Sequence, residues 1–253
     1  MSDLDRLKRF LSGASVDGAV FGLRSDYRAM LVAVEGIIPG SSDAMSGALV
    51  ETAQAAAREM LRNRPVEDVE HVAAWREAYR AFGAKPQRTR NSLEALLRRA
   101  ATESGLPRVN RLTDVYNAIS VLHQLPLGGE DLSRYDAAPR LIRATGSEPF
   151  STVANGETVI DYPDPGEVVW CDDGGVTCRR WNWRQTRRTQ LTDETSTALF
   201  ILDALAPLSD AALTAAADDL VGHLARLGPD VQSVRRLIAA PGHPAGAITT
   251  EGD

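Results

Sequence analysis

The sequence predicts an α+β fold in which a sheet-based core is flanked by helices. Apolar, β-branched runs alternate along the chain with alanine-rich stretches whose apolar positions recur at helical spacing. The 253 residues are 43% hydrophobic and 25% charged, a composition that can bury a substantial core. Because no internal repeat and no linker marks a boundary, we expect one domain over residues 1–240 and a small, polar, flexible tail over 241–253.

The first half of the chain is expected to contain two strands and then four helices. The apolar runs at 19–23 and 30–38 are typical of strands separated by a polar turn. Asn91 and Glu94 form a capping-box pattern that predicts the start of a helix. Apolar residues recur at helical spacing in the ranges 43–63, 66–82, 91–105 and 110–123.

The second half of the chain is expected to begin with short strands and to end with helices. Short runs of strand-forming residues, broken by Gly, Pro and Asp, predict a sheet with hairpins near 141–145, 158–162, 167–172 and 176–184. Thr192, followed by two acidic residues, has the pattern of a helix N-cap. Two further helices are expected at 209–227 and 230–239, separated by Gly228 and Pro229.

Composition and motifs exclude several classes of protein. No apolar run approaches the roughly 20 residues that a membrane helix needs, so we expect a cytoplasmic protein without a membrane partner. No phosphate loop or dinucleotide fingerprint is present, and we expect no cofactor. Cys171 and Cys178 have no neighbouring histidine, which predicts no metal site. They flank a turn-like segment; we favour a reduced pair, although a hairpin there is compatible with a disulfide.

Charge is unevenly distributed along the chain. The formal net charge of -6 argues against a protein that coats nucleic acid, and we expect no DNA partner. Two segments are nevertheless basic: the range 76–111 has nine Arg or Lys against three acids, and 179–188 has five arginines and no acid. This pattern indicates either a localised contact with a polyanion or solvated faces that pair with acids elsewhere. The candidate RNA contacts are Lys85, Arg88, Arg90, Arg187 and Arg188.

The segment 176–184 is interpreted as a strand whose side chains alternate between two faces. Trp181 and Trp183 on one face are either a platform for stacked RNA bases or part of the core, and we favour the core. The opposite face is polar and cationic. Its Arg180, Asn182 and Arg184 would then line a cavity, where an arginine fork suits a carboxylate or a phosphate.

The sequence Gly128-Gly129-Glu130-Asp131 is a second candidate site, because it follows an amphipathic helix and a turn. The glycines either let a ligand approach the backbone closely or only form a bend. Adjacent side chains of a strand point to opposite faces, so Glu130 and Asp131 are not expected to act as an acid/base couple. The polar face of the preceding helix carries Asn117, a further candidate ligand contact.

Several segments, taken in their order along the chain, resemble one known family. They are WREAYRAFG (75–83), SLEALLRR (92–99), LPRVN (106–110), TDVYNAIS (113–120), LGGED (127–131) and CRRWNWR (178–184). The chain resembles the stand-alone B3/B4 proteins, relatives of the B3/B4 domain in the β subunit of bacterial phenylalanyl-tRNA synthetase, over roughly residues 15–240. The resemblance implies a three-layer α+β fold with an unusual β-sandwich and a pocket between sheet and helices.

The resemblance also implies a function. In the synthetase this domain hydrolyses tyrosine wrongly attached to the phenylalanine tRNA, so a free-standing copy would be a trans-acting aminoacyl-tRNA editing deacylase. Arg180, Asn182 and Arg184 would orient the aminoacyl-adenosine end, and Glu130 or a bound water would assist attack on the ester. The alternatives are a non-catalytic module that binds a tRNA end, a free amino acid or a nucleoside-like metabolite, or a basic segment 76–111 that docks a synthetase or ribosome.

The sequence departs from the synthetase at two positions of its pocket. The synthetase's editing histidine falls on Gly128, and its pocket glutamate falls near Ile201. Neither polar side chain is carried over at these positions. Hydrolysis by this chain would therefore rest on a positioned water and other polarising donors.

Overall fold

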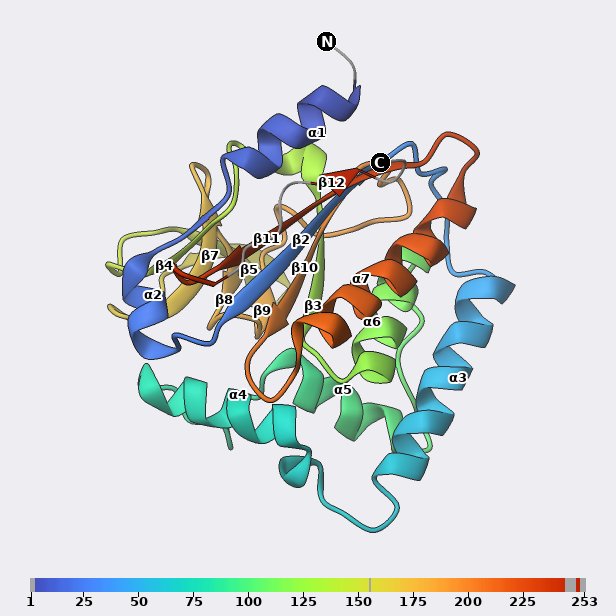
Figure 1. Ribbon diagram of the computed structural model, residues 1–253, viewed down its shortest axis with the longest axis horizontal. Coiled ribbons are helices and arrows are strands. Elements are labelled where there is room, and N and C mark those ends of the chain that lie inside the picture. Colours follow the sequence, from blue (N-terminus) through green and yellow to red (C-terminus); the bar gives the residue numbers. More distant parts are fainter. Residues whose placement is uncertain (1–2, 155, 244–248, 251–253) are drawn as a thin grey trace.

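Two β-sheets and a layer of helices make up the fold, as the computed structural model in Figure 1 shows. The structure describes residues 3–154, 156–243 and 249–250. The antiparallel central sheet has the strand order β12 (Thr249–Thr250), β11 (Gln232–Ala239), β2 (Arg28–Glu35), β10 (Ala198–Ala204) and β3 (Leu127–Asp131). The outer sheet has the order β1 (Ser15–Val16), β4 (Arg140–Arg143), β7 (Val168–Asp172), β8 (Gly175–Arg179) and β9 (Arg184–Gln185).

Helices α6 (Arg111–His123) and α7 (Asp210–Leu224) cover the face of the central sheet that points away from the outer sheet, and α3 (Ala44–Met60) packs against α6. Helices α4 (Glu70–Ala81) and α5 (Ser92–Ala100) lie at one end of the sheet (Figure 1). Helix α1 (Asp3–Ser12) packs against β11 and β2 on the side of the outer sheet, and α2 (Gly18–Leu23) packs against β4. Short 3-10 turns occupy Val66–Asp68, Leu132–Arg134 and Ala225–Leu227, and a separate hairpin consists of β5 (Phe150–Ala154) and β6 (Glu157–Asp161). No helix in the described part of the chain has the length and apolar character needed to cross a membrane.

Strand β2 shows how the three layers form. All eight of its residues are buried, as expected for a strand covered on both faces. Leu31 and Ala33 point into the core between the two sheets, which also contains α1 and α4. Met30 and Val32 point into a second core under α6 and α7. The α+β class and the layered β-sandwich expected from the sequence are confirmed.

Three of the predicted elements are wrong. Residues 19–23 form α2 and not a strand, because the Asp17 side chain accepts the Ala19 amide and caps a helix. The helix expected after Thr192 is a turn that leads into β10, and the helix expected at 230–239 is β11. Both strands pair with β2 along its whole length, and this tertiary pairing outweighs local helix signals.

The predicted tail lies mostly outside the described residues. Residues 244–248 and 251–253 are not described, so their flexibility stays a prediction. The described pair 249–250 forms β12, which extends the central sheet beside β11.

His71 joins α4, the end of α6 and the end of β10. Its Nδ1–H donates to the Gln124 carbonyl (2.8 Å), while Nε2 accepts from the Trp75 indole and from the Leu205 backbone amide, both at 3.1 Å. Burial lowers the pKa of His71 to about 4. The ring is therefore neutral at physiological pH, as one donating and one accepting nitrogen require.

We expect His71→Leu to lower the free energy of unfolding by about 3 kcal/mol, because buried polar groups left without partners each cost about 1–3 kcal/mol. Urea denaturation measures the loss. His71 has a folded-state pKa below the ordinary value of 6.5, so its contribution is complete above that value and is lost as the pH falls through about 4. The difference in the free energy of unfolding between His71→Leu and wild type should therefore decrease as the pH falls from 6.5 towards about 4.

The control is His123→Leu, which removes a half-exposed ring that pairs with Asp219. A surface ion pair contributes about 0–1 kcal/mol, so this variant should stay close to wild type. Equal losses in the two variants would contradict the role assigned to His71.

Candidate functional site

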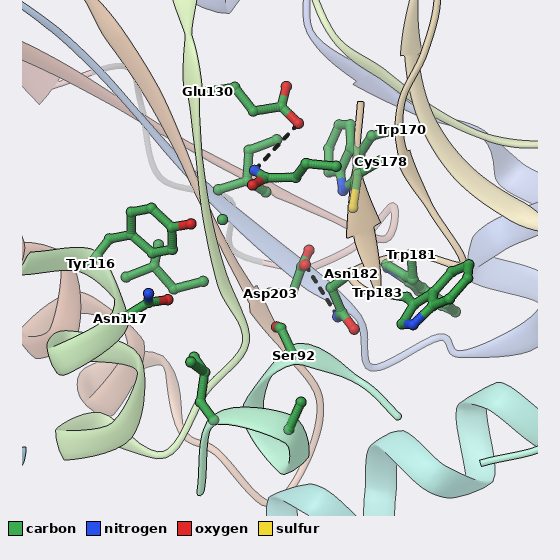
Figure 2. A pocket seen from close by; sticks show the side chains of 16 residues that line it. Ser92, Tyr116, Asn117, Glu130, Trp170, Cys178, Trp181, Asn182, Trp183 and Asp203 are labelled. Carbon is green, nitrogen blue, oxygen red and sulfur yellow. Dashed lines mark hydrogen bonds between the residues drawn. The ribbon is translucent and has the colours of Figure 1, made fainter. Parts of the chain in front are cut away.

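A cavity of about 220 Å³ lies where the outer sheet, strands β3 and β10, and helices α5 and α6 meet (Figure 2). An apolar cavity of roughly 150 Å³ holds one benzene molecule, whereas sites for drug-sized ligands enclose about 300–1,000 Å³. This cavity therefore suits a group of the size of a single amino acid. Its wall consists of Ser92, Ala95, Leu96, Tyr116, Asn117, Leu127, Gly128, Glu130, Trp170, Cys178, Trp181, Asn182, Trp183, Gln185, Ile201 and Asp203.

Two helices with capped N-termini, α5 and α6, form one side of the cavity wall. The Asn91 side chain accepts the Glu94 amide (2.9 Å) and caps the start of α5 as predicted, whereas the Glu94 carboxylate does not complete a capping box but accepts from Arg76 and Arg98. The Asn110 side chain accepts the Thr113 amide (2.8 Å) and starts α6. These caps satisfy free amides and fix the helix ends, so that α6 presents Asn117 to the cavity.

Glu130 lies on β3 and is 2% exposed. The Tyr135 hydroxyl donates to its Oε2, and the Gln185 amide donates to its Oε1 (3.5 Å) and to the Gly129 carbonyl (2.9 Å). Burial raises the pKa of Glu130 to about 7. A carboxyl with such a pKa can both accept and return a proton near neutral pH, which is what a general base needs.

Asp203 is the second acid of the cavity, and the sequence reasoning missed it. It accepts hydrogen bonds from the Tyr27 hydroxyl (2.6 Å) and the Asn182 amide (3.2 Å; Figure 2), and Tyr79 in turn donates to Asn182 (2.9 Å). Burial raises the pKa of Asp203 to about 7. Once 198–204 is known to be a strand, its period of two puts Asp203 on the same face as Ile201, which also lines the cavity.

The strand predicted over 176–184 ends early, at a turn held by a buried ion pair. Glu167 accepts two hydrogen bonds from Arg179 (2.6 and 2.8 Å) and one from the Arg180 amide (3.1 Å). Arg180 and Trp181 have φ values of 49° and 68°, in the left-handed region. Their conformation ends β8, and the Trp181 amide then donates to the Val168 carbonyl (2.6 Å). Strict alternation of faces therefore stops at Arg179.

Because of this turn, the predicted arginines lie outside the cavity. Arg180 donates to the Thr89 hydroxyl, and its guanidinium stands 4.6 Å from the Trp183 ring centroid. Arg184 is exposed and stands 5.9 Å from the same ring. The prediction that both line the pocket beside Asn182 is wrong in its geometry: Asn182 lines the cavity, and so does Trp183, which was assigned to the core.

The two glycines differ in what surrounds them. A Cβ on Gly129 would lie 2.8 Å from Phe200 and from Tyr116, so this glycine is needed for close packing. Gly128 lines the cavity, and a Cβ there would lie 3.1 Å from the Gln185 amide nitrogen. At the position where the resemblance placed a histidine, the space is therefore bordered by the Gln185 carboxamide.

Beside the cavity, four arginines surround Trp183 in an open depression of about 440 Å³. This arginine rim comprises Arg88, Arg90, Arg98 and Arg99. Ala95 and Trp183 line both the depression and the cavity, so the two are adjacent. Part of the charge is compensated, since Arg90 and Arg98 lie 3.6 and 3.1 Å from Glu94.

The remaining predicted RNA contacts fall into two groups. Lys85 and Arg187 are exposed, and Lys85 shares a second depression with Arg88 and Arg180. Arg188, by contrast, pairs with the buried Asp172 carboxylate and donates to the Arg134 carbonyl (2.7 Å). Its guanidinium therefore binds groups of the protein itself.

Both cysteines are free and buried, on the hairpin formed by β7 and β8. Cys178 lines the cavity, and burial raises the pKa of its thiol well above the ordinary range. A protonated thiol is a poor nucleophile. Within the residues that the structure describes, no group of three or more His, Cys, Asp or Glu side chains is arranged to hold a metal ion.

We expect Asp203→Asn to stabilise the protein more at alkaline than at acidic pH. The folded-state pKa of Asp203 is about 7 against an ordinary 3.8, so its favourable contribution is complete below 3.8 and is lost as the pH rises through about 7. Tm relative to wild type, measured at about pH 5 and about pH 8.5, should therefore increase between the two conditions. The exposed Glu51→Gln serves as the control, and the same pH trend in both variants would contradict the prediction.

Comparison with known proteins gives two findings. A family model described as the B3/4 domain matches residues 74–218, more than half of the chain, and every residue of the cavity wall lies inside this range. An N-terminal fragment of the phenylalanyl-tRNA synthetase β subunit from Pyrococcus horikoshii has a similar structure, with a TM-score of 0.46 and 11% identity. The alignment covers 95% of this chain and 54% of the fragment, so this chain spans about half of its length. A search of curated proteins found no match.

Proposed function

The chain belongs to the B3/4 domain family, as its sequence motifs indicated, and from this premise we propose that it is a trans-acting aminoacyl-tRNA editing deacylase. The reaction is hydrolysis of the ester that joins a wrongly attached amino acid to the tRNA end. The partners are an aminoacylated tRNA and its aminoacyl-adenosine end, and the chemistry needs only water and polarising side chains.

One observation carries the proposal: an amino-acid-sized cavity with a buried general-base candidate lies directly beside a cluster of arginines. An aminoacylated tRNA end has a matching layout, because its phosphates are anionic and its amino acid is the terminal group. The arginine rim supplies the charge for phosphate contacts, together with Arg180 and Arg184 beside the Trp183 ring and the exposed Lys85 and Arg187. Trp183 separates this surface from the cavity.

Glu130 is the proposed general base. It takes a proton from water as the water oxygen attacks the ester carbonyl carbon, and the ribose hydroxyl leaves with that proton. Tyr135 and Gln185 hold the Glu130 carboxyl in one orientation. Asn117 lines the cavity, and its amide is the proposed donor that polarises the ester carbonyl.

A second candidate function is a non-catalytic module that binds an amino acid, a nucleoside-like metabolite or a tRNA end in the same cavity. A specific observation favours it. Both oxygens of Glu130 are already engaged by Tyr135 and Gln185, and the wall contains no histidine. Ligand binding that stabilises the protein, without turnover of any mischarged tRNA, would support this function.

We expect the purified protein to release the amino acid from at least one tRNA in a panel of mischarged tRNAs. Glu130→Gln should lower kcat by about 10²–10⁴-fold, the usual contribution of general acid–base catalysis. Because the pKa of Glu130 is about 7 and the carboxylate is the active form, the wild-type rate should fall as the pH drops below that value. The control is the exposed Glu157→Gln. If no tRNA loses its amino acid faster than without protein, the proposal fails.

We expect Arg88→Ala and Arg184→Ala to raise KM for tRNA with little change in kcat, because these arginines lie outside the cavity. Each lost phosphate contact should also reduce the dependence of log KM on log salt by about one unit. Steady-state kinetics at several salt concentrations measure both effects. Arg226→Ala, an exposed arginine after α7, is the matched control. Unchanged KM and salt dependence in both Arg88→Ala and Arg184→Ala would refute the tRNA contact.

A further inference from the structure

The ionisable side chains in the cavity wall are all acidic. Glu130 and Asp203 are its carboxyls, and burial keeps the thiol of Cys178 and the phenol of Tyr116 protonated by raising their pKa. The wall contains no Lys, Arg or His. A carboxylate or phosphate that entered the cavity would therefore find no cation to neutralise it, and burial of an unpaired anion is costly.

Asp203 is a carboxyl that lacks a cationic partner. Its hydrogen-bond partners, Tyr27, Asn182 and the Trp170 indole, are neutral, and no ion pair involves it among the described residues. It is 2% exposed, so water compensates it poorly. A buried carboxylate held by neutral donors is stabilised further when a cation approaches, because Coulomb attraction is strong where the dielectric constant is low.

One hydrogen-bond donor in the wall also lacks a partner. The Ser92 hydroxyl is buried and makes no hydrogen bond within the described part of the chain. Buried donors are normally satisfied, so a free one at the cavity indicates a ligand that brings an acceptor oxygen. This observation is independent of the acidic residues.

We propose that the cavity recognises the protonated α-amine of an amino acid through Asp203, and that it admits the amino acid only when its carboxyl is esterified or amidated. The inference rests on the proposed function, since it defines the chemical form of the substrate at the same site. An ester carbonyl supplies the acceptor that Ser92 lacks, and the ammonium supplies the cation that Asp203 lacks. A free amino acid carries a carboxylate, which the acidic wall repels.

Binding of small, non-hydrolysable ligands to the wild-type protein tests this chemistry. The probes are the amides of the standard amino acids, followed by the free acid and the N-acetyl amide of the amino acid that binds best. Trp170, Trp181 and Trp183 line the cavity, so intrinsic fluorescence reports occupancy, and calorimetry gives Kd. We expect the amide to bind at least about tenfold more tightly than the free acid and than the N-acetyl amide, as a buried charge pair implies.

Particular binding results would refute recognition of the α-amine by Asp203. A free acid or an N-acetyl amide that binds as tightly as the amide would refute it, as would the absence of binding by every amide at millimolar concentration. Asp203→Asn should bind the amide and the N-acetyl amide alike, and a retained preference would refute the assignment to Asp203. The control is Asp131→Asn, a carboxyl that bonds Ser133 and Thr195 away from the cavity. If Asp203→Asn does not fold, the comparison of wild-type ligands still decides.

Failure of this inference can be told apart from failure of the proposed function. Amide-selective binding without release of amino acids from tRNA would support amine recognition and refute the deacylase. Release that proceeds equally fast from N-acetyl-aminoacyl-tRNA would support the deacylase and refute amine recognition.

Discussion

The buried ion pair between Glu167 and Arg179 is the interaction on which the site depends. Its two hydrogen bonds, together with the bond from the Arg180 amide to Glu167, hold two successive non-glycine residues in the left-handed region. Such a conformation costs on the order of 1–3 kcal/mol per residue and persists only where the surroundings determine it. The turn redirects the chain, so that Trp181, Asn182, Trp183 and Gln185 form one wall of the cavity.

The opposite wall depends on the central sheet. Strand β10 pairs with β2 on one side and with β3 on the other, and it is buried on both faces. This position brings Asp203 and Glu130 from neighbouring strands into one cavity (Figure 2). Their burial raises the pKa of both carboxyls to about 7, because the low dielectric of the interior disfavours the charged form. The fold thus holds two buried carboxyls, whose charged forms are energetically unfavourable, in one cavity. Such groups are typical of functional sites.

Acidic and basic side chains lie on opposite sides of Trp183. Carboxyls and the unpartnered Ser92 hydroxyl lie on the cavity side, and the arginine rim lies on the other. A ligand that spans both sides would need an anionic part outside and a cationic or neutral part inside. This separation links the proposed hydrolysis of an aminoacyl ester, the contact with tRNA and the recognition of an α-amine in one arrangement of residues.

The sequence by itself determined the α+β class, the strand at β2, most of the helices and the family, because periodicity, caps such as Asn91 and ordered motifs are local signals. It also singled out Glu130, Gly128 and Asn182. Only the tertiary structure decided that 198–204 and 232–239 are strands, that Arg180 and Arg184 lie outside the cavity, and that Asp203 lies inside it. The physical reason is that strand pairing with β2 and the distant Glu167 carboxylate set these conformations, and neither contact leaves a signal in the neighbouring sequence.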